Sequence, residues 1–109
     1  MKREAPVEPG CKITMQYRAG NGFMYELESS GVIFGVHVSR AEASGRTDSF
    51  SVTAHHGRNT PAVVSESGPT GDEALRNVAR TWTAKCSELG LPTLDWNKIA
   101  AALVAVRAI

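Results

Sequence analysis

The stretch FSVTAHHGR, residues 50–58, places two histidines side by side, and these are the side chains best suited to chemistry in the sequence. Imidazoles bind metal ions and act as general bases. If the strand that precedes them continues through the pair, however, adjacent side chains point to opposite faces of a sheet. We therefore expect His55 on a polar face and His56 toward the apolar face. Only a strand that ended at Ala54 would let both rings converge.

A second histidine on the polar face, His37, is a better partner for His55. In a hairpin closed by residues 42–48, the two become diagonal neighbours if Gly35 lies opposite His55, with Cα atoms ~7–8 Å apart. A register shifted by two residues would separate them. Two nitrogen ligands still fall short of the three or four that a zinc site uses. We therefore assign no metal ligand and no cofactor.

The two cysteines, Cys11 and Cys86, are the candidate nucleophiles. A catalytic thiol needs a histidine within hydrogen-bond reach and a group that orients it. Both cysteines instead fall on apolar faces of expected elements, where cysteine acts as a small hydrophobe. The sequence has no glycine-rich phosphate loop ahead of a helix either. We assign no catalytic residue and expect a protein that is not an enzyme.

Apolar residues recur at every second position over residues 11–19, 23–28, 32–41 and 48–56, which predicts four strands. Their short connections, GNG, SSG and EASGRTD, favour an antiparallel meander. Residues 61–65 are a candidate fifth strand at the sheet edge. The side chains expected to face inward are Cys11, Ile13, Met15, Tyr17, Phe23, Tyr25, Leu27, Val32, Phe34, Val36, Val38, Phe50, Val52 and Ala54.

After residue 69 the apolar period becomes that of a helix. Thr70 and Glu73 have the spacing of a capping box, and Gly90 with Pro92 ends the segment. A second helix begins near Thr93 or Asp95. The expected buried stripes are Leu75, Val78, Ala79, Trp82, Cys86 and Leu89 in the first helix, and Trp96, Ile99, Leu103 and Val106 in the second. Strands followed by helices indicate an α+β domain with both helices on one face of the sheet.

Composition and charge narrow the class of protein. The 42% of hydrophobic and 21% of charged residues are typical of a globular domain. Residues 1–10 are expected to be a flexible lead-in and residues 11–109 a single domain. The sequence shows neither a secretory signal nor an apolar run long enough to span a bilayer, which favours a cytoplasmic protein without membrane contact.

The C-terminal segment WNKIAAALVAVRAI predicts a helix that is apolar nearly all round, a pattern usual for buried helices. One side should cover the sheet, which leaves Ala101, Val104, Ala105 and Ala108 on the other. We expect this side to contact a protein partner or a second copy of the chain. The alternative is that alanine is there as the best helix former. The expected function is therefore a small interaction or regulatory module that acts through this helix, as a homodimer in one version.

The polar face of the sheet is a second candidate surface, with Lys12, Gln16, Arg18, His37 and His55. A nucleic-acid-binding domain that uses this face is the alternative function. Single strands bind in basic grooves that also offer aromatic rings. Here the net charge is only +1, with 12 basic and 11 acidic residues. The aromatic residues of the strands all have the inward parity, so the sequence favours the protein partner.

Overall fold

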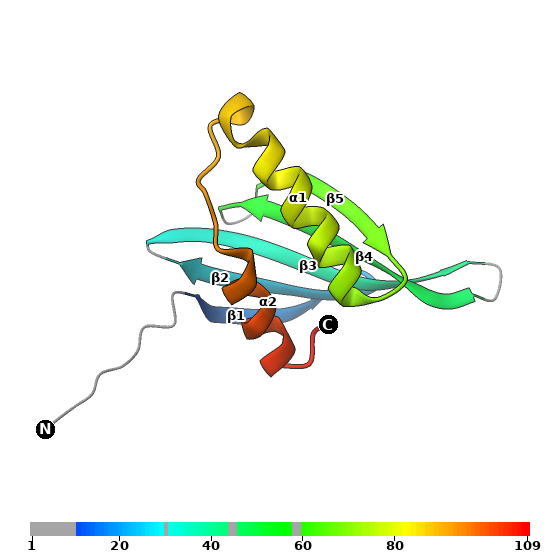
Figure 1. Cartoon of the computed structure of the whole chain (residues 1–109). Helices are drawn as coiled ribbons and strands as arrows, with labels where there is room; N and C mark the ends of the chain where they lie inside the picture. The colour runs from blue at the N-terminus through cyan, green and yellow to red at the C-terminus, as the bar shows by residue number, and fades with distance from the viewer. Residues whose placement is uncertain (1–10, 30, 44–45, 58–59) are drawn as a thin grey trace, which may run out of the picture.

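The computed structural model describes residues 11–29, 31–43, 46–57 and 60–109, so the expected lead-in at residues 1–10 lies outside the described part. Five strands precede two helices: β1 (Lys12–Ala19), β2 (Gly22–Ser29), β3 (Val32–Ala43), β4 (Arg46–His56), β5 (Ala62–Gly68), α1 (Gly71–Leu89) and α2 (Trp96–Ala105). The strands form one antiparallel sheet in the order β1-β2-β3-β4-β5 (Figure 1). The predicted α+β meander is confirmed, and the segment around Val63 is its fifth strand, at the edge.

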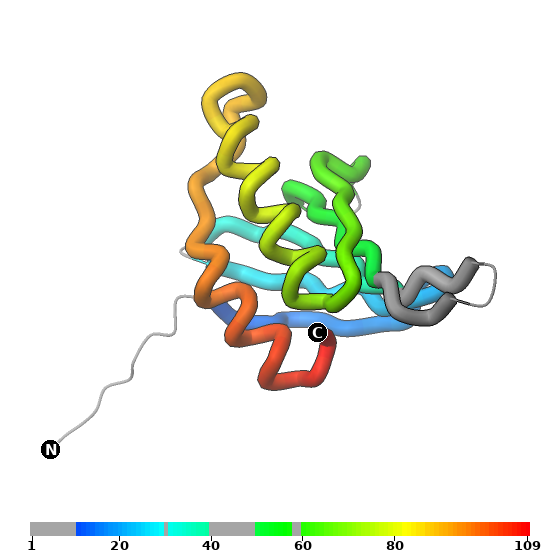
Figure 2. Tube along the Cα trace, turned by 45° about the vertical axis from the view of Figure 1, so that its right-hand side comes forward, coloured from blue at the N-terminus to red at the C-terminus, as the bar shows by residue number. Residues whose placement is uncertain are grey.

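Both helices cover the same face of the sheet. Helix α1 packs on β4 and β5, whereas α2 lies over β1 and β2 (Figures 1 and 2). We call the covered side the helix face and the other side the open face. The core between sheet and helices contains side chains with no exposed surface, among them Leu27, Phe34, Val36, Val52, Val78, Trp82, Ile99 and Leu103. Neither helix is long and apolar enough to cross a membrane.

The ends of the helices follow local sequence signals. Thr70 caps α1, because its hydroxyl accepts a hydrogen bond from the Glu73 amide at 3.1 Å. Gly90 ends α1 in the left-handed conformation, with φ 66°. Asp95, one of the two expected positions, caps α2. Leu89 was expected to be buried but is 50% exposed, because the last turn of α1 extends past the sheet (Figure 1).

The alternation of side chains breaks early in β1, and this break decides which residues of that strand face the helices. Ile13 pairs with Leu27, but the next pair along the sheet is Met15 with Glu26, so Thr14 is an extra residue, a β-bulge. The Thr14 hydroxyl donates a hydrogen bond to the Glu26 carbonyl at 3.2 Å. Because side chains alternate with a period of two, one inserted residue sends every later side chain of the strand to the opposite face.

The predicted faces are therefore wrong for the second half of β1. Met15 and Tyr17 lie on the open face, where they are 50% and 40% exposed. Gln16 and Arg18 lie on the helix face, where they pair with Tyr25 and Phe23.

Two tyrosines on neighbouring strands test this assignment. Tyr25 is 5% exposed and Tyr17 is 40% exposed, although the sequence pattern places both inward. We expect Tyr25→Ala to lower the free energy of unfolding by about 3 kcal/mol, since it empties part of the core, and Tyr17→Ala to lower it by less than about 1 kcal/mol. Urea denaturation of both variants measures the difference. Similar losses would contradict the bulge.

Candidate binding surfaces

Of the two registers that the sequence left open for the β3–β4 hairpin, the structure has the one that brings the histidines together. Gly35 lies opposite His55, and His37 lies opposite Thr53, so the two histidines are diagonal neighbours on the open face. His56 points to the helix face, where its ring meets Trp82 edge-on with centroids 6.4 Å apart. The prediction that the adjacent pair is divided between two faces is confirmed.

The two histidines of the open face bond in opposite directions. His37 Nε2 lies 2.8 Å from the Ala19 carbonyl of β1, and His55 Nδ1 lies 2.9 Å from the Thr60 carbonyl beside β5. A carbonyl oxygen only accepts, so in both rings the bonded nitrogen carries the hydrogen. Over the described part of the chain, no three His, Cys, Asp or Glu residues gather in a way that could hold a metal ion.

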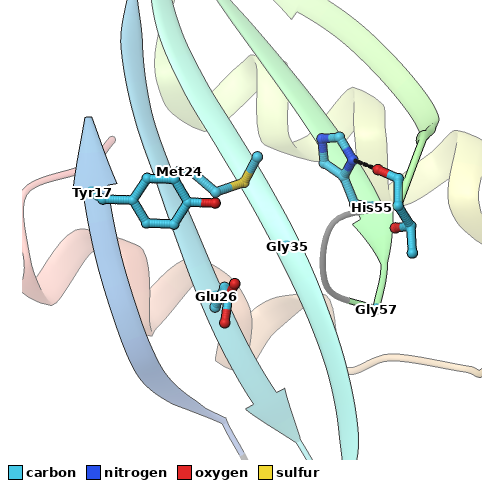
Figure 3. A pocket seen from close by; sticks show the side chains of 7 residues that line it. Tyr17, Met24, Glu26, Gly35, His55 and Gly57 are labelled. Atoms are coloured by element: carbon cyan, nitrogen blue, oxygen red, sulfur yellow. Dashed lines mark hydrogen bonds between the residues drawn. The ribbon is translucent and has the colours of Figure 1, made fainter. Parts of the chain in front are cut away.

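A small pocket of about 80 Å³ lies on the open face, and its lining includes Tyr17, Met24, Glu26 and His55 (Figure 3). Glu26 and His55 stand in one row across the sheet, with Gly35 between them. The glycine has no side chain and so leaves a gap between the carboxylate and the imidazole. The pocket is well below the ~300 Å³ at which ligand sites begin. It has room for a few atoms, not for a whole ligand.

A larger groove of about 420 Å³ lies on the helix face, where the β1–β2 hairpin meets the segment that follows α2. We call it the hairpin groove and define it by six of its lining residues: Gln16, Arg18, Phe23, Tyr25, Val106 and Arg107. The bulge at Thr14 creates its polar wall, because it turns Gln16 and Arg18 to this side. Phe23 has the inward parity that the sequence predicts, but it is 38% exposed.

Charge and aromatic rings meet in the hairpin groove. The guanidinium carbon of Arg18 lies 5.4 Å from the centroid of the Phe23 ring, within the range of a cation–π contact. The Phe23 and Tyr25 rings are 6.4 Å apart. In the described part of the chain, the lining of the groove includes two arginines and no acidic residue.

Arg107 reaches the groove through an unusual backbone. Its φ of 62° is in the left-handed region, which costs a non-glycine residue about 1 kcal/mol or more. The turn is held by two backbone hydrogen bonds, from the Arg107 amide to Val104 and from the Ala108 amide to Leu103, at 2.9 and 2.8 Å. This turn ends α2 and carries the chain back toward the sheet.

The outer side of α2 is partly as expected. Ala101, Val104 and Ala105 are exposed, and Val104 is 55% exposed. Ala108 does not belong with them. It lies beyond the helix, after the turn at Arg107, and packs partly buried against the core. The prediction for Ala108 is wrong, because it assumed that the helix continued to the end of the segment.

The five polar residues expected on one sheet face divide between two faces. Lys12, His37 and His55 lie on the open face, whereas Gln16 and Arg18 line the hairpin groove. Sequence reasoning missed Phe23 and Arg107 as groove residues. For Arg107 a signal was present, since it is the single charge that follows a long apolar run. The exposure of Phe23 depends on how far α2 extends over the sheet, which no local pattern reveals.

The two cysteines differ in their surroundings. Cys11 is buried, and loss of solvation, together with the nearby Asp95 carboxylate, raises the pKa of its thiol to about 11. The reactive thiolate is therefore disfavoured at neutral pH. The Cys86 thiol, which is half-buried, donates a weak hydrogen bond to the Pro92 carbonyl at 3.7 Å.

The buried Cys11 thiol predicts a dependence of stability on alkaline pH. Its pKa is raised in the folded chain, so its contribution is complete below the ordinary thiol pKa of 9.0 and is lost as pH rises toward about 11. We expect the loss to be about 2 kcal/mol and to be absent in Cys11→Ala. Burial also raises the pKa of Tyr25, and this effect is shared by the wild-type chain and Cys11→Ala. Urea denaturation between pH 8 and 11 compares them, and equal slopes would contradict the burial of Cys11.

Comparisons of the chain with protein-family models, with curated proteins and with solved structures give no match.

Proposed function

We propose that this chain is a small non-enzymatic interaction module that associates with a second copy of itself through the outer side of α2. The contact surface is the α2 patch, which consists of Ala101, Val104 and Ala105. The observation that carries the proposal is the 55% exposure of Val104 between two exposed alanines on a helix without a charged residue after Lys98.

The opposite side of α2 fixes the patch on the outside. Ile99 and Leu103 have no exposed surface, and they attach the helix to the core. A rotation that buried Val104 would bring these two larger side chains into water, at a cost of about 1.5–3 kcal/mol each. The helix therefore cannot hide the patch within the monomer.

The small side chains of the patch suit a helix pair. Alanines at positions 101 and 105 are one turn apart, and small residues at a contact let helix axes approach to about 8 Å. A two-fold axis through the patch would bring the same surface of both copies together. Val106 was expected to be buried but is 40% exposed; it follows the helix and lines the hairpin groove, so it does not belong to the patch.

The size of the patch sets the expected strength of association. Stable protein interfaces bury about 1,200–2,000 Å² in total, which is more than a few alanine and valine side chains supply. We therefore infer a reversible dimer with a dissociation constant in the range of tens of micromolar or above, and not a permanent one.

The alternative function, binding of nucleic acid at the polar sheet face, has less support. Lys12, His37 and His55 share the open face with Glu26 and Glu28, whose charges oppose the binding of phosphates. Both histidines also use a ring nitrogen to bond a backbone carbonyl.

A charge placed in the α2 patch tests the proposal. Val104→Glu puts a carboxylate at the centre of the contact. We expect the dissociation constant of the dimer to rise at least about tenfold, because burying an unpaired charge is costly. Sedimentation equilibrium from about 10 µM to 1 mM measures the constant for the wild-type chain and the variant.

The matched control adds the same charge elsewhere. Ala84 is exposed on α1, away from the patch, so Ala84→Glu should leave self-association unchanged. A wild-type chain that remains monomeric at 1 mM, or equal effects of the two substitutions, would refute the homodimer.

A further inference from the structure

The hairpin groove has the dimensions of a ligand site. Its volume of about 420 Å³ falls within the ~300–1,000 Å³ typical of small-molecule pockets, whereas the pocket on the open face, at about 80 Å³, does not. The sheet supplies most of the lining of the groove, with residues from β1, β2, β3 and β4, and the turn at Arg107 closes one side. Most of its lining side chains therefore come from a rigid sheet and do not need to be ordered by a ligand.

The charge of the groove selects an anion. Among the lining residues that the structure describes, Arg18 and Arg107 are charged and none is acidic, in a chain whose positive and negative charges nearly balance. Guanidinium groups stay charged at every relevant pH and bind phosphate or carboxylate through paired N–H donors.

The aromatic side of the groove selects a planar group. Phe23 is 38% exposed although it faces the core side of the sheet, and Tyr25 beneath it is 5% exposed and fixed. The Arg18 guanidinium already lies against the Phe23 ring. Planar bases stack on aromatic rings and on guanidinium planes alike, so an incoming ring would extend this stack. A ligand without a ring would use the charge of the groove but leave its exposed aromatic surface in water.

Two amide side chains complete the set. Gln16 and Asn21 line the same groove, and each offers both hydrogen-bond donors and an acceptor. Such groups can bond the polar edge of a heterocyclic base, which also presents donors and acceptors. Charge, stacking surface and amides are therefore gathered on one side of the molecule.

We propose that the hairpin groove binds a nucleotide, with its base against the Arg18–Phe23 stack and its phosphate beside the guanidinium groups of Arg18 and Arg107. The same chemistry is presented by a free nucleotide and by one unit of a single strand. The site is distinct from the α2 patch and from the open face, and it does not depend on self-association.

Calorimetry of the full chain with AMP, and fluorescence anisotropy with a labelled 15-nucleotide oligo-dA, test the proposal at 50 mM salt. We expect binding of AMP, of the oligonucleotide or of both. Binding of AMP alone assigns the groove to free nucleotides, and binding of the oligonucleotide alone assigns it to single strands. If neither AMP nor the oligonucleotide binds, the proposal is wrong.

Two substitutions locate the bound probe. Arg18→Gln removes the charge, and Phe23→Leu keeps an apolar side chain but removes the ring. We expect each to weaken binding about tenfold, since a charged phosphate contact and a stacked base each contribute this much. Arg18 is exposed, so Arg18→Gln should fold normally and decides the matter if Phe23→Leu is unstable.

The control removes a positive charge from another part of the surface. Lys85→Gln changes net charge as Arg18→Gln does, but Lys85 is exposed on α1 and lines neither the groove nor the open face. The affinity of this variant for the probes should differ from that of the wild-type chain by less than about twofold. Equal losses in Lys85→Gln and Arg18→Gln would show unspecific attraction and overturn the site, as would inorganic phosphate binding as tightly as AMP.

Discussion

The extra residue at Thr14 is the constraint on which the two faces of the sheet depend. When helices cover one face of a sheet, every strand must direct its apolar side chains to that face. A bulge inserts one residue and so exchanges the two faces for the rest of the strand. In β1 the first half keeps the expected order, with Ile13 paired to Leu27, and the second half is reversed from Met15 onward. The reversal moves Arg18 from the open face to the helix face and so brings a charge next to Phe23.

The two helices explain why that charge remains accessible. Helix α1 covers β4 and β5 and buries Trp82 completely, while the shorter α2 covers β1 and β2 (Figure 2). Because α2 ends at Ala105, it stops short of the turn that joins β1 to β2, and the chain turns back at Arg107. The uncovered end of the helix face is the hairpin groove. Its existence follows from the length of one helix and the register of one strand.

Much of the fold could be predicted from the sequence, because its signals are local. The twofold and 3.6-residue periods identify the strands and helices, and Thr70, Gly90 and Asp95 mark the helix ends. The register that pairs Gly35 with His55 was one of two that the sequence left open, because alternation places side chains on a face but does not fix how far two strands slide past each other. The reversal in β1 was not predictable. The segment CKITMQYRA alternates without a fault, and only its pairing with β2 shows that Thr14 is extra.

The candidate sites were less predictable, since each depends on contacts between distant segments. The α2 patch was expected from its alanines, but the loss of Ala108 from it depends on where the helix stops. The hairpin groove combines residues from β1, β2 and the segment after α2, and no linear pattern joins them.

The histidines of the open face add connections that the backbone ladder does not make. Each donates one ring N–H to a backbone carbonyl, at Ala19 for His37 and at Thr60 for His55. His37 lies on β3 and Ala19 on β1, so this bond passes over β2 and joins two strands that are not neighbours in the sheet. His55 holds the segment that leads into the edge strand β5 in the same way. Both margins of the sheet are thus held by a side chain from its middle as well as by their own strand pairing.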